Sequence, residues 1–289
     1  MIRSTLFLGV SLTLEKKLHP NAIRRLILDQ SKRANVGHIG SCLCVAEILA
    51  ALYGEVMKGK PGDADRDRFI LSKGHAALAL YAVLRLLGEI TDEELNTFCC
   101  DGSFFGVHPE RAVPGIDFST GSLGHGLSIA VGAALAARMQ KSQRRLFCLI
   151  SDAECNEGSV WEAVMFAAHH KLHNLHVIID ANGQQAFGLT RDVLNASNLN
   201  ERWKSFGWRV SEVDGHSVSA LVNVLSSESN DSAPHVVIAT TTFGRGVSFM
   251  EQGRPLSQAH LPVQPINWHY LPMSDQEYKI ALAELERAH

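Results

Sequence analysis

Two short, mostly apolar runs stand out in this chain, and each is followed by a polar residue. The runs 146–151 and 175–180 carry the apolar pattern of parallel strands that are buried on both faces. The stretch between them has the length and pattern of a crossover helix, so the carboxyl ends of the two strands should lie side by side. Asp152 and Asn182, which follow the two runs, should therefore face one crevice.

The rest of the chain alternates predicted helices with predicted strands. Helical patterns or start signals occur at 15–35, 45–57, 76–87, from 91 onward, 127–139, 220–225 and 274–288, and further strands at 69–71, 208–213 and 235–240. We expect Ser41 to cap the second of these helices and Ser274 the last. This alternation predicts an α/β fold with a mostly parallel sheet and helices on both faces. We expect residues 1–14 to form a tail and residues 15–289 to form one domain.

Composition narrows the class of partner. The 289 residues have a net charge of −3, with 46% apolar and 20% charged residues, which is the profile of an ordinary globular protein. No basic run is longer than a pair such as Arg144 and Arg145, and this disfavours nucleic acid as the main partner. The apolar stretch 6–10 is too short to span a bilayer, and no convincing signal cleavage site follows it.

The cysteine pattern bears on metal and redox chemistry. The six cysteines are Cys42, Cys44, Cys99, Cys100, Cys148 and Cys155. None forms a C-x-x-C pair, which argues against a zinc site. A chain this large and apolar also has little need of a disulfide framework. A reducing compartment fits best, so we expect a cytoplasmic protein.

The polar residues after the two strands suit a hard divalent cation. Asp152 offers a carboxylate, Asn182 an amide oxygen, and the backbone near Gln184 a third oxygen. Mg²⁺ prefers such ligands and usually keeps waters or phosphate oxygens in its other positions, and a helix start after Asp152 also favours phosphate. The alternative is purely structural, because Asp commonly caps helices and Asn commonly sits in turns.

This pair of residues resembles a motif of enzymes that use thiamin diphosphate, which begins Gly-Asp-Gly and ends in Asn at a similar distance. From roughly residue 21 to residue 284, the chain is similar to the amino-terminal half of transketolase, in the form split over two polypeptides. The landmarks lie at 37–41, 65–69, 72–76, 106–109, 119–124, 157–163, 212–216 and 244–248. Their number and order are specific, and the resemblance implies the thiamin-diphosphate-binding fold.

The resemblance also implies how the cofactor is held. Asp152, Asn182 and the backbone carbonyl of Gln184 would bind Mg²⁺, Ca²⁺ or Mn²⁺, and the metal would hold the diphosphate of thiamin diphosphate. Gly121 and Leu123 would contact the aminopyrimidine and thiazolium rings from this side of a subunit interface.

Three histidines and one glutamate complete the implied site. His38, His75 and His108 would lie on the thiazolium and substrate side, with His75 also touching the cofactor. Imidazole can transfer protons near neutral pH, as carbonyl addition and carbon–carbon cleavage require. Taken singly, a histidine after a glycine often only braces a loop. Glu157 would sit at the contact with a partner subunit.

The chain departs from the family pattern at several positions. Ser151 and Ala153 replace both glycines of the Gly-Asp-Gly motif, and a methyl group at Ala153, a candidate cofactor contact, could crowd the diphosphate. Ile39 stands where the family has proline, and His125 where it commonly has glutamine. His260 is a candidate for a further family histidine, but the residues around it align poorly.

The implied function is that of a transketolase-type subunit that moves a two-carbon ketol unit from a ketose to an aldose. The pyrimidine-binding half, with the glutamate that activates the cofactor, would come from a separate chain, in a two-plus-two heterotetramer. Alone, this chain should be inactive. Two alternatives stay open: ketol or acyl transfer to an unusual sugar in a specialised pathway, and a degenerate binding subunit without catalysis. Nicotinamide binding is disfavoured because no G-x-G-x-x-G follows a strand.

Overall fold

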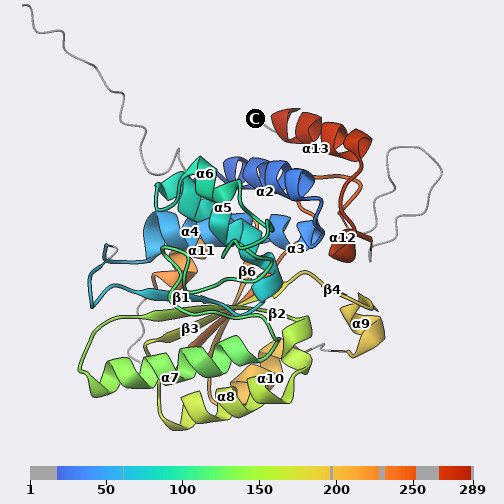
Figure 1. Cartoon of the computed structure of the whole chain (residues 1–289). Coiled ribbons are helices and arrows are strands. Elements are labelled where there is room, and N and C mark those ends of the chain that lie inside the picture. Colours follow the sequence, from blue (N-terminus) through green and yellow to red (C-terminus); the bar gives the residue numbers. More distant parts are fainter. Residues whose placement is uncertain (1–17, 61, 196–197, 228–231, 252–266, 288–289) are drawn as a thin grey trace, which may run out of the picture.

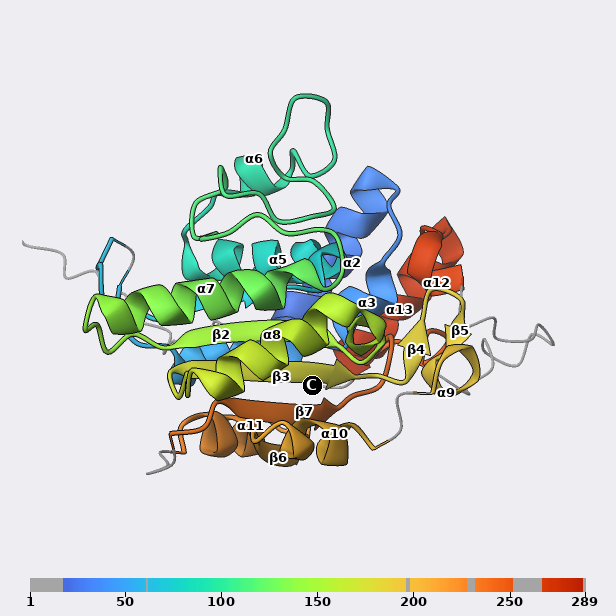
Figure 2. The ribbon, with the colours of Figure 1, turned by 90° about the horizontal axis from the view of Figure 1, so that it is seen from below.

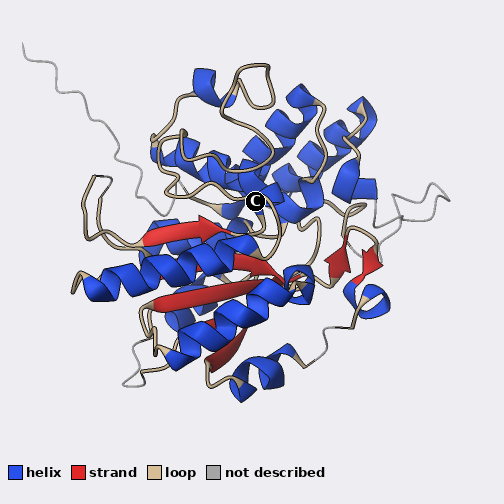
Figure 3. Ribbon diagram, turned by 60° about the horizontal axis from the view of Figure 1, so that its bottom comes forward, coloured by secondary structure: helices blue, strands red, loops and turns tan. Residues whose placement is uncertain are grey.

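One parallel sheet organises the molecule. In the computed structural model, the described residues are 18–60, 62–195, 198–227, 232–251 and 267–287. Five parallel strands lie in the order β1 (Arg68–Leu71), β2 (Leu146–Ser151), β3 (Leu175–Ala181), β7 (His235–Thr240) and β6 (Arg209–Asp214). The short strands β4 (Gln184–Gln185) and β5 (Gly188–Leu189) form a separate antiparallel pair. Figure 3 shows the sheet with helices around it.

Helices cover both faces of this sheet, as the sequence predicts (Figures 1 and 2). The α-helices are α2 (Pro20–Ala34), α3 (Ile39–Leu43), α4 (Ala46–Ala51), α5 (Ala77–Leu87), α6 (Asp92–Leu95), α7 (His125–Met139), α8 (Gly158–His169), α9 (Thr190–Val193), α10 (Leu199–Ser205), α11 (Val218–Leu225), α12 (Asn267–Tyr270) and α13 (Asp275–Arg287). Shorter turns of helix are the π-helical η1 (Leu52–Val56) and the 3₁₀ turns η2 (Gly74–Ala76) and η3 (Ala153–Asn156).

The strands send alternate side chains into two separate cores. In β2, Phe147 and Leu149 belong to the core that includes α2, α4, α5 and α11. Cys148 and Ile150 belong to the core beneath α7, α8 and α10. Because successive strand residues point to opposite faces, a strand between two helix layers must be apolar at every position. This explains why the strand signal in the sequence is a continuous apolar run.

The first helix begins later than predicted. The predicted start at residue 15 lies outside the described residues, and the described Leu18 and His19 precede the helix, which starts at Pro20. Proline suits the first helical turn because that turn has no partner for its N–H groups. The His19 Nδ1 accepts a hydrogen bond from the Asn21 N–H at 3.3 Å and so supplies the cap.

The predicted cap at Ser41 is wrong. Ser41 is buried within α3, and the next helix begins at Ala46 with Val45 as its cap and no side-chain capping bond. The segment Ile39–Val56 is long and apolar enough to cross a membrane, but 83% of it is buried inside the protein. Burial of this apolar run in the core therefore decides where its helices start, rather than a polar side chain.

Other helix ends follow the sequence closely. Thr91 forms a capping box with Glu94 at the start of α6, and Ser274 accepts a hydrogen bond from the Glu277 N–H before α13. Helix α7 begins at His125, two residues before the predicted start, after a glycine in the left-handed region. The short elements β4, β5, α9, α10 and α12 were not predicted.

Candidate functional site

The two residues expected to share a crevice do lie at one edge of the sheet. Ser151 pairs with Asp180 at the carboxyl ends of β2 and β3, and the chain turns outward after both. Asp152 Oδ2 accepts a hydrogen bond from the Gly183 N–H at 3.0 Å and a second from the Thr190 hydroxyl at 3.0 Å. The carboxylate thus ties the β2 end to the loop that carries Asn182, and both predicted ligands are buried.

A buried ion pair fixes the orientation of Asn182. The Asn182 side-chain N–H donates to Asp180 Oδ2 at 2.8 Å, so the amide oxygen is turned toward the Gln184 backbone N–H, which it meets at 2.9 Å. Lys73 donates to the same Asp180 oxygen at 2.5 Å, and both charged side chains are fully buried. Asp180 therefore connects the predicted metal ligand to the loop that carries His75.

The charge at this corner fits a divalent cation. Burial, and then the nearby Asp180, raise the pKa of Asp152 to about 6. Among the described residues, Asp152 forms no salt bridge, and no cluster of three His, Cys, Asp or Glu side chains is placed to hold a metal. Of the predicted ligands, only Asp152 belongs to those four residue types. The others are the side-chain amide of Asn182 and the backbone carbonyl of buried Gln184. A buried carboxylate without a cationic partner gains most from a bound cation.

Histidine side chains gather beside this corner, including one that the sequence did not reveal. The rings of His38 and His75 lie 5.5 Å apart between centroids, and His269 lies 5.8 Å from His38 and 5.7 Å from His75. The His38 backbone N–H donates to the His269 carbonyl at 3.1 Å. His269 also stacks on Phe243, with 5.7 Å between ring centroids and 11° between planes.

These imidazoles are neutral near pH 7. Burial lowers the pKa of His38, with His108 adding to the effect, and lowers the pKa of His75 well below its usual value. Burial, with His38 and Lys73, lowers the pKa of His269 to about 4. A neutral imidazole has one nitrogen that accepts a hydrogen bond and one that donates, so this cluster can bind substrate hydroxyl and carbonyl groups and can accept a proton.

The loop carrying His108 packs against glycines of two other site loops. A Cβ atom on Gly74 would lie 3.2 Å from His108 Cδ2 and 3.0 Å from the Gly121 Cα, and one on Gly121 would lie 3.4 Å from His108 Cγ. His108 itself is exposed. The structure therefore brings His108 and Gly121 together, while Leu123 is half-buried on the same loop.

Glu157 lies at the start of α8 with its side chain exposed. It packs against Gly124, where a Cβ atom would come within 2.8 Å of the Glu157 Cβ. Gly124 has a φ of +83°, in the left-handed region that favours glycine. Exposure at the carboxyl edge leaves Glu157 available for the subunit contact implied by the resemblance.

The buried Glu154 is a second residue that the sequence did not single out. Its carboxylate accepts hydrogen bonds from the Ser72 hydroxyl, from the Gly124 N–H at 2.7 Å and from the Ser151 N–H at 3.4 Å. Burial raises its pKa. Glu154 therefore joins three separate site loops, and Ser151, one of the two residues replacing a motif glycine, takes part in this network.

The structure also places two of the other residues that depart from the family pattern. Ala153 is half-buried, and its backbone N–H donates to Asp152 Oδ1 at 2.8 Å. His125 is exposed as the first residue of α7. His260 lies outside the described residues. His269 could have been suspected only as a histidine between Trp268 and Tyr270, because its neighbours His38 and His75 are far away in sequence.

Comparison with known proteins identifies relatives of this fold and site. Residues 15–267 match the family described as "Transketolase, thiamine diphosphate binding domain". A relative from Phocaeicola vulgatus, named as one of the subunits of apulose-4-phosphate transketolase, is 37% identical over 94% of this chain and 94% of its own length. The SqwG subunit of 6-deoxy-6-sulfo-D-fructose transketolase from Clostridium sp. is 38% identical over 92% of this chain and 94% of its own.

Solved transketolase structures are also similar to this chain. Transketolase of Campylobacter jejuni superposes with a TM-score of 0.82 at 28% identity, covering 96% of this chain and 43% of that protein. Transketolase of Leishmania mexicana has a TM-score of 0.82 at 29% identity, covering 95% of this chain and 41% of that one. The chain thus spans about two fifths of these solved transketolases.

Proposed function

Since this chain belongs to the transketolase family and carries its thiamine diphosphate binding domain, we propose that it is the cofactor-holding subunit of a two-chain enzyme. That enzyme transfers a two-carbon ketol unit from a ketose to an aldose. One observation carries the proposal. At one edge of the sheet, Asp152 is hydrogen-bonded to the loop that carries Asn182, beside the cluster of His38, His75 and His269.

The metal corner holds the diphosphate end of the cofactor. Asp152, Asn182 and the backbone carbonyl of Gln184 supply oxygen ligands to Mg²⁺ or a similar divalent ion. Asp180, itself paired with Lys73, fixes the Asn182 amide, whose oxygen also accepts a hydrogen bond from the Gln184 backbone N–H. The cofactor, when bound, supplies the chemistry that breaks and forms the carbon–carbon bond.

The histidines act on the sugar. Neutral imidazoles of His38, His75 and His269 bind the hydroxyl and carbonyl oxygens of the ketose and move protons at those oxygens. His108, on the exposed loop beside Gly121, reaches the same substrate from the open side. These roles need neutral rings, and burial lowers the pKa values of His38, His75 and His269.

A pyrimidine-binding partner chain completes the site. Figures 1 and 2 show α9 and α12 on the same side of the molecule. Exposed apolar side chains lie in these helices or close to them in sequence: Phe187, Leu194, Tyr270 and Leu271. Glu157, Gly121 and Leu123 face this contact. Three relatives that match more than nine tenths of the chain are each named as one subunit of a transketolase. Those names support a partner chain, and two-fold symmetry favours a two-plus-two heterotetramer in the cytoplasm.

The test is reconstitution with the partner. The chain is mixed with a candidate pyrimidine-domain protein from the same organism, thiamin diphosphate and Mg²⁺, and ketol transfer from a ketose phosphate is measured. We expect turnover only when both chains are present, and a loss of at least about a hundredfold in His75→Ala. A folded two-chain complex that turns over no ketose would contradict the proposal. Lys204→Ala, an exposed change remote from the site, serves as the control.

The donor sugar is a second question, and specialised substrates are favoured by one finding. Relatives that match nearly the whole chain are named for apulose-4-phosphate and for 6-deoxy-6-sulfo-D-fructose. A donor screen with the reconstituted enzyme separates the two cases, because a specialised enzyme prefers such a ketose over xylulose 5-phosphate. Calorimetry of the complex with thiamin diphosphate and Mg²⁺ tests the degenerate alternative, which requires that no metal-dependent heat be seen.

A further inference from the structure

The turn formed by Asp214, Gly215 and His216 belongs to one of the landmark segments of the sequence, but the function proposed above gives it no role. Asp214 pairs with Thr240 at the carboxyl ends of β6 and β7, and the Gly215 N–H donates to the Thr240 carbonyl at 2.8 Å. A Cβ atom on Gly215 would clash with the Thr241 side chain, so the turn rests directly on the end of β7. This close approach carries His216 to the segment that follows β7.

Both ring nitrogens of His216 form hydrogen bonds. Nε2 accepts from the Thr242 backbone N–H at 2.8 Å, and Nδ1 lies 3.1 Å from Glu47 Oε2. A backbone N–H can only donate and a carboxylate can only accept, so the two bonds together require a ring whose one proton is on Nδ1. In this form His216 links Glu47 on α4 to the backbone after β7.

Glu47 is itself held by Arg24. Arg24 Nη2 donates to both carboxylate oxygens, at 2.8 and 2.6 Å, and both side chains are buried. Burial alone would raise the pKa of Glu47, but its bonds to His216 and Arg24 outweigh burial and lower that pKa. Glu47 is therefore charged at neutral pH, and charge-assisted hydrogen bonds of this kind are strong. His216 thus has a firm anchor in the core between α2 and α4.

Residues 241–244, the segment that follows β7, contact the metal corner. Thr241 Oγ1 donates to Asp180 Oδ1 at 2.5 Å, and Asp180 Oδ2 accepts from the Asn182 side-chain N–H at 2.8 Å. The Thr241 backbone N–H donates to the Ala181 carbonyl at 3.3 Å. A shift of this segment would therefore move the amide that is predicted to bind the metal.

The same segment supports the histidine cluster. The Phe243 ring stacks on His269, and the Gly244 N–H donates to the Gly40 carbonyl at 3.1 Å. Gly40 lies two residues after His38, and a Cβ atom on Gly40 would clash with the Phe243 ring. The segment therefore packs directly against the loops that carry His38 and His269.

We propose that His216 is a positioning residue of this site, which fixes residues 241–244 so that the metal corner and the histidine cluster keep their relative placement. It acts through the Thr242 backbone rather than by contact with substrate. The consequence for turnover rests on the function proposed above, because small displacements of reacting groups lower catalytic rates strongly. The placement itself concerns only this chain and can be tested without activity.

Amide hydrogen exchange of the full chain tests the placement. Three backbone N–H groups report it: Thr242 at the His216 contact, Gly183 at the metal corner and His38 at the histidine cluster. In His216→Phe we expect all three to exchange at least about tenfold faster, because the first loses its acceptor and the other two lose their alignment. Native exchange at Gly183 and His38 in this variant would overturn the proposal.

Two amide variants separate the contacts of His216. His216→Gln places a carboxamide near the position of Nε2, so its exchange should stay within about threefold of the native rates. His216→Asn is one methylene shorter and reaches Glu47 rather than Thr242, so it should behave like His216→Phe. Equal exchange in the Gln and Asn variants would contradict the role of the Nε2 contact. Both side chains are polar, so this pair decides the matter even if His216→Phe fails to fold.

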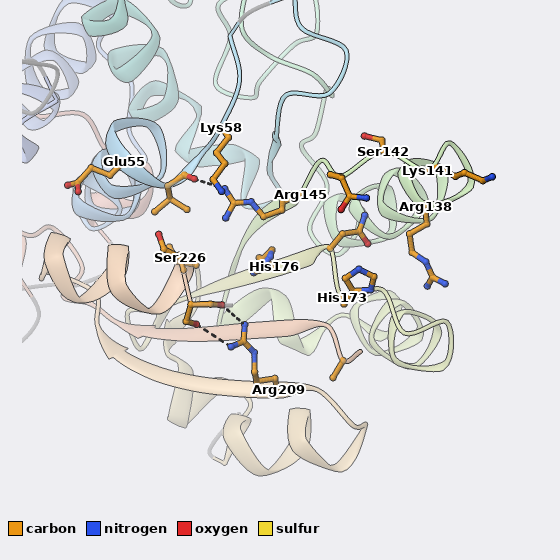
Figure 4. Close-up of a pocket in the computed structure, with 16 residues that line it drawn as sticks. Glu55, Lys58, Arg138, Lys141, Ser142, Arg145, His173, His176, Arg209 and Ser226 are labelled. Atoms are coloured by element: carbon orange, nitrogen blue, oxygen red, sulfur yellow. Dashed lines mark hydrogen bonds between the residues drawn. The ribbon is translucent and has the colours of Figure 1, made fainter. Parts of the chain in front are cut away.

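His235 offers a matched control at the other end of β7. It is buried, and its Nδ1 lies 2.8 Å from Arg209 Nη2 and its Nε2 lies 3.0 Å from the Ser211 hydroxyl. Arg209 lies beside the amino-edge cavity drawn in Figure 4, where it donates to Ser227. The six residues of β7, at about 3.3 Å each, place this end roughly 20 Å from the site.

His235→Phe therefore removes a buried, doubly bonded imidazole without touching residues 241–244. The three reporter amides should exchange at least about fivefold faster in His216→Phe than in His235→Phe. Equal acceleration in the two variants would mean a general loss of stability and would overturn the proposal.

The reconstituted two-chain enzyme tests the consequence for turnover. In His216→Phe, kcat should fall at least about tenfold while KM for the ketose stays within about threefold, and His216→Gln should recover most of the loss. His235→Phe should keep the native kcat, and equal losses in the two phenylalanine variants would refute a positioning role. A native complex that turns over no ketose would instead refute the ketol-transfer proposal, and the exchange rates would still decide the placement.

Discussion

Asp180 makes more side-chain contacts beside the predicted metal ligands than any residue singled out from the sequence. It accepts hydrogen bonds from Lys73, from Asn182, and from the Thr241 hydroxyl at 2.5 Å. Burial alone would raise its pKa, but the Lys73 ammonium outweighs burial and lowers the pKa of Asp180. The same pairing raises the pKa of Lys73 against the effect of burial. Both groups are therefore charged, and each depends on the other.

Asp180→Asn should destabilise the chain strongly. It leaves Lys73 charged and without its partner in a fully buried position, and removing one member of a buried pair costs about 3–5 kcal/mol. Urea unfolding measures the change. Lys204→Ala, which removes an exposed pair with Glu201, is the control and should change the free energy of unfolding by less than about 1 kcal/mol. A similar small effect in Asp180→Asn would refute this account of the pair.

His269 should make the chain less stable in acid. Burial lowers the pKa of His269 from 6.5 to about 4, so between these pH values the unfolded state binds a proton that the folded state does not. Stability contributed by the neutral ring is therefore complete above pH 6.5 and falls as pH drops to 4, by roughly 3 kcal/mol.

The substitution His269→Phe tests this by removing the titrating group while keeping a ring to stack on Phe243. Free energies of unfolding at pH 7 and pH 4.5 should differ less in this variant than in the native chain. His125→Phe, at an exposed position, should keep the native difference. An unchanged acid dependence in His269→Phe would show that the other buried histidines carry it.

At the scale of elements, helix α7 shows how glycine serves two purposes within one segment. A Cβ atom on Gly126 would lie 2.6 Å from the Ser72 Cα and 2.5 Å from its Cβ, so the helix start rests directly on the site loop. A Cβ atom on Gly132 would meet nothing within 4 Å. The first glycine is required by close approach, and the second only adds backbone freedom to the helix.

The two glycines should therefore respond in opposite directions to alanine. Gly132→Ala should raise the free energy of unfolding by about 0.5–1 kcal/mol, the gain in helix propensity. Gly126→Ala should lower it by more than about 1 kcal/mol, because backbone must move away from Ser72. Thermal unfolding monitored by circular dichroism compares the pair. A stabilising Gly126→Ala would mean that α7 does not rest on this loop.

The sequence predicted elements well where one local signal decides the structure. The two neighbours of the central strand, β2 and β7, have the predicted bounds, because a strand covered on both faces is apolar at nearly every position. Ser41 was wrong as a cap because burial of the whole segment overrides local capping. The short β4 and β5 have two residues each, too few to form a periodic pattern.

Only the site residues that belong to local sequence motifs could be predicted. Asp152 and Asn182 follow strands, so parallel topology alone brings them to one edge. His269 and Glu154 act through contacts with loops elsewhere in the chain, for example between Glu154 and Ser72. Such contacts depend on the packed structure, and no spacing in the sequence reports them.

For the whole molecule, the two-chain enzyme proposed above has one decisive consequence: a cofactor bound between two chains would couple their assembly to its own binding. If thiamin diphosphate and Mg²⁺ contact both chains, they favour the assembled complex, and the partner must favour cofactor binding by the same factor. The exposed apolar side chains of Phe187 and Leu194 beside the site are consistent with an interface that closes over it.

We expect cofactor and Mg²⁺ to lower the apparent dissociation constant of the two chains at least tenfold, a coupling of about 1.4 kcal/mol. Sedimentation or light scattering at several protein concentrations measures this shift. Asp152→Asn is the matched control, since it removes the charge of the proposed metal ligand without changing side-chain size, and its assembly should not respond to cofactor. If native assembly were equally tight with and without cofactor, the cofactor would be held by a single chain, and the shared site proposed for this enzyme would be wrong.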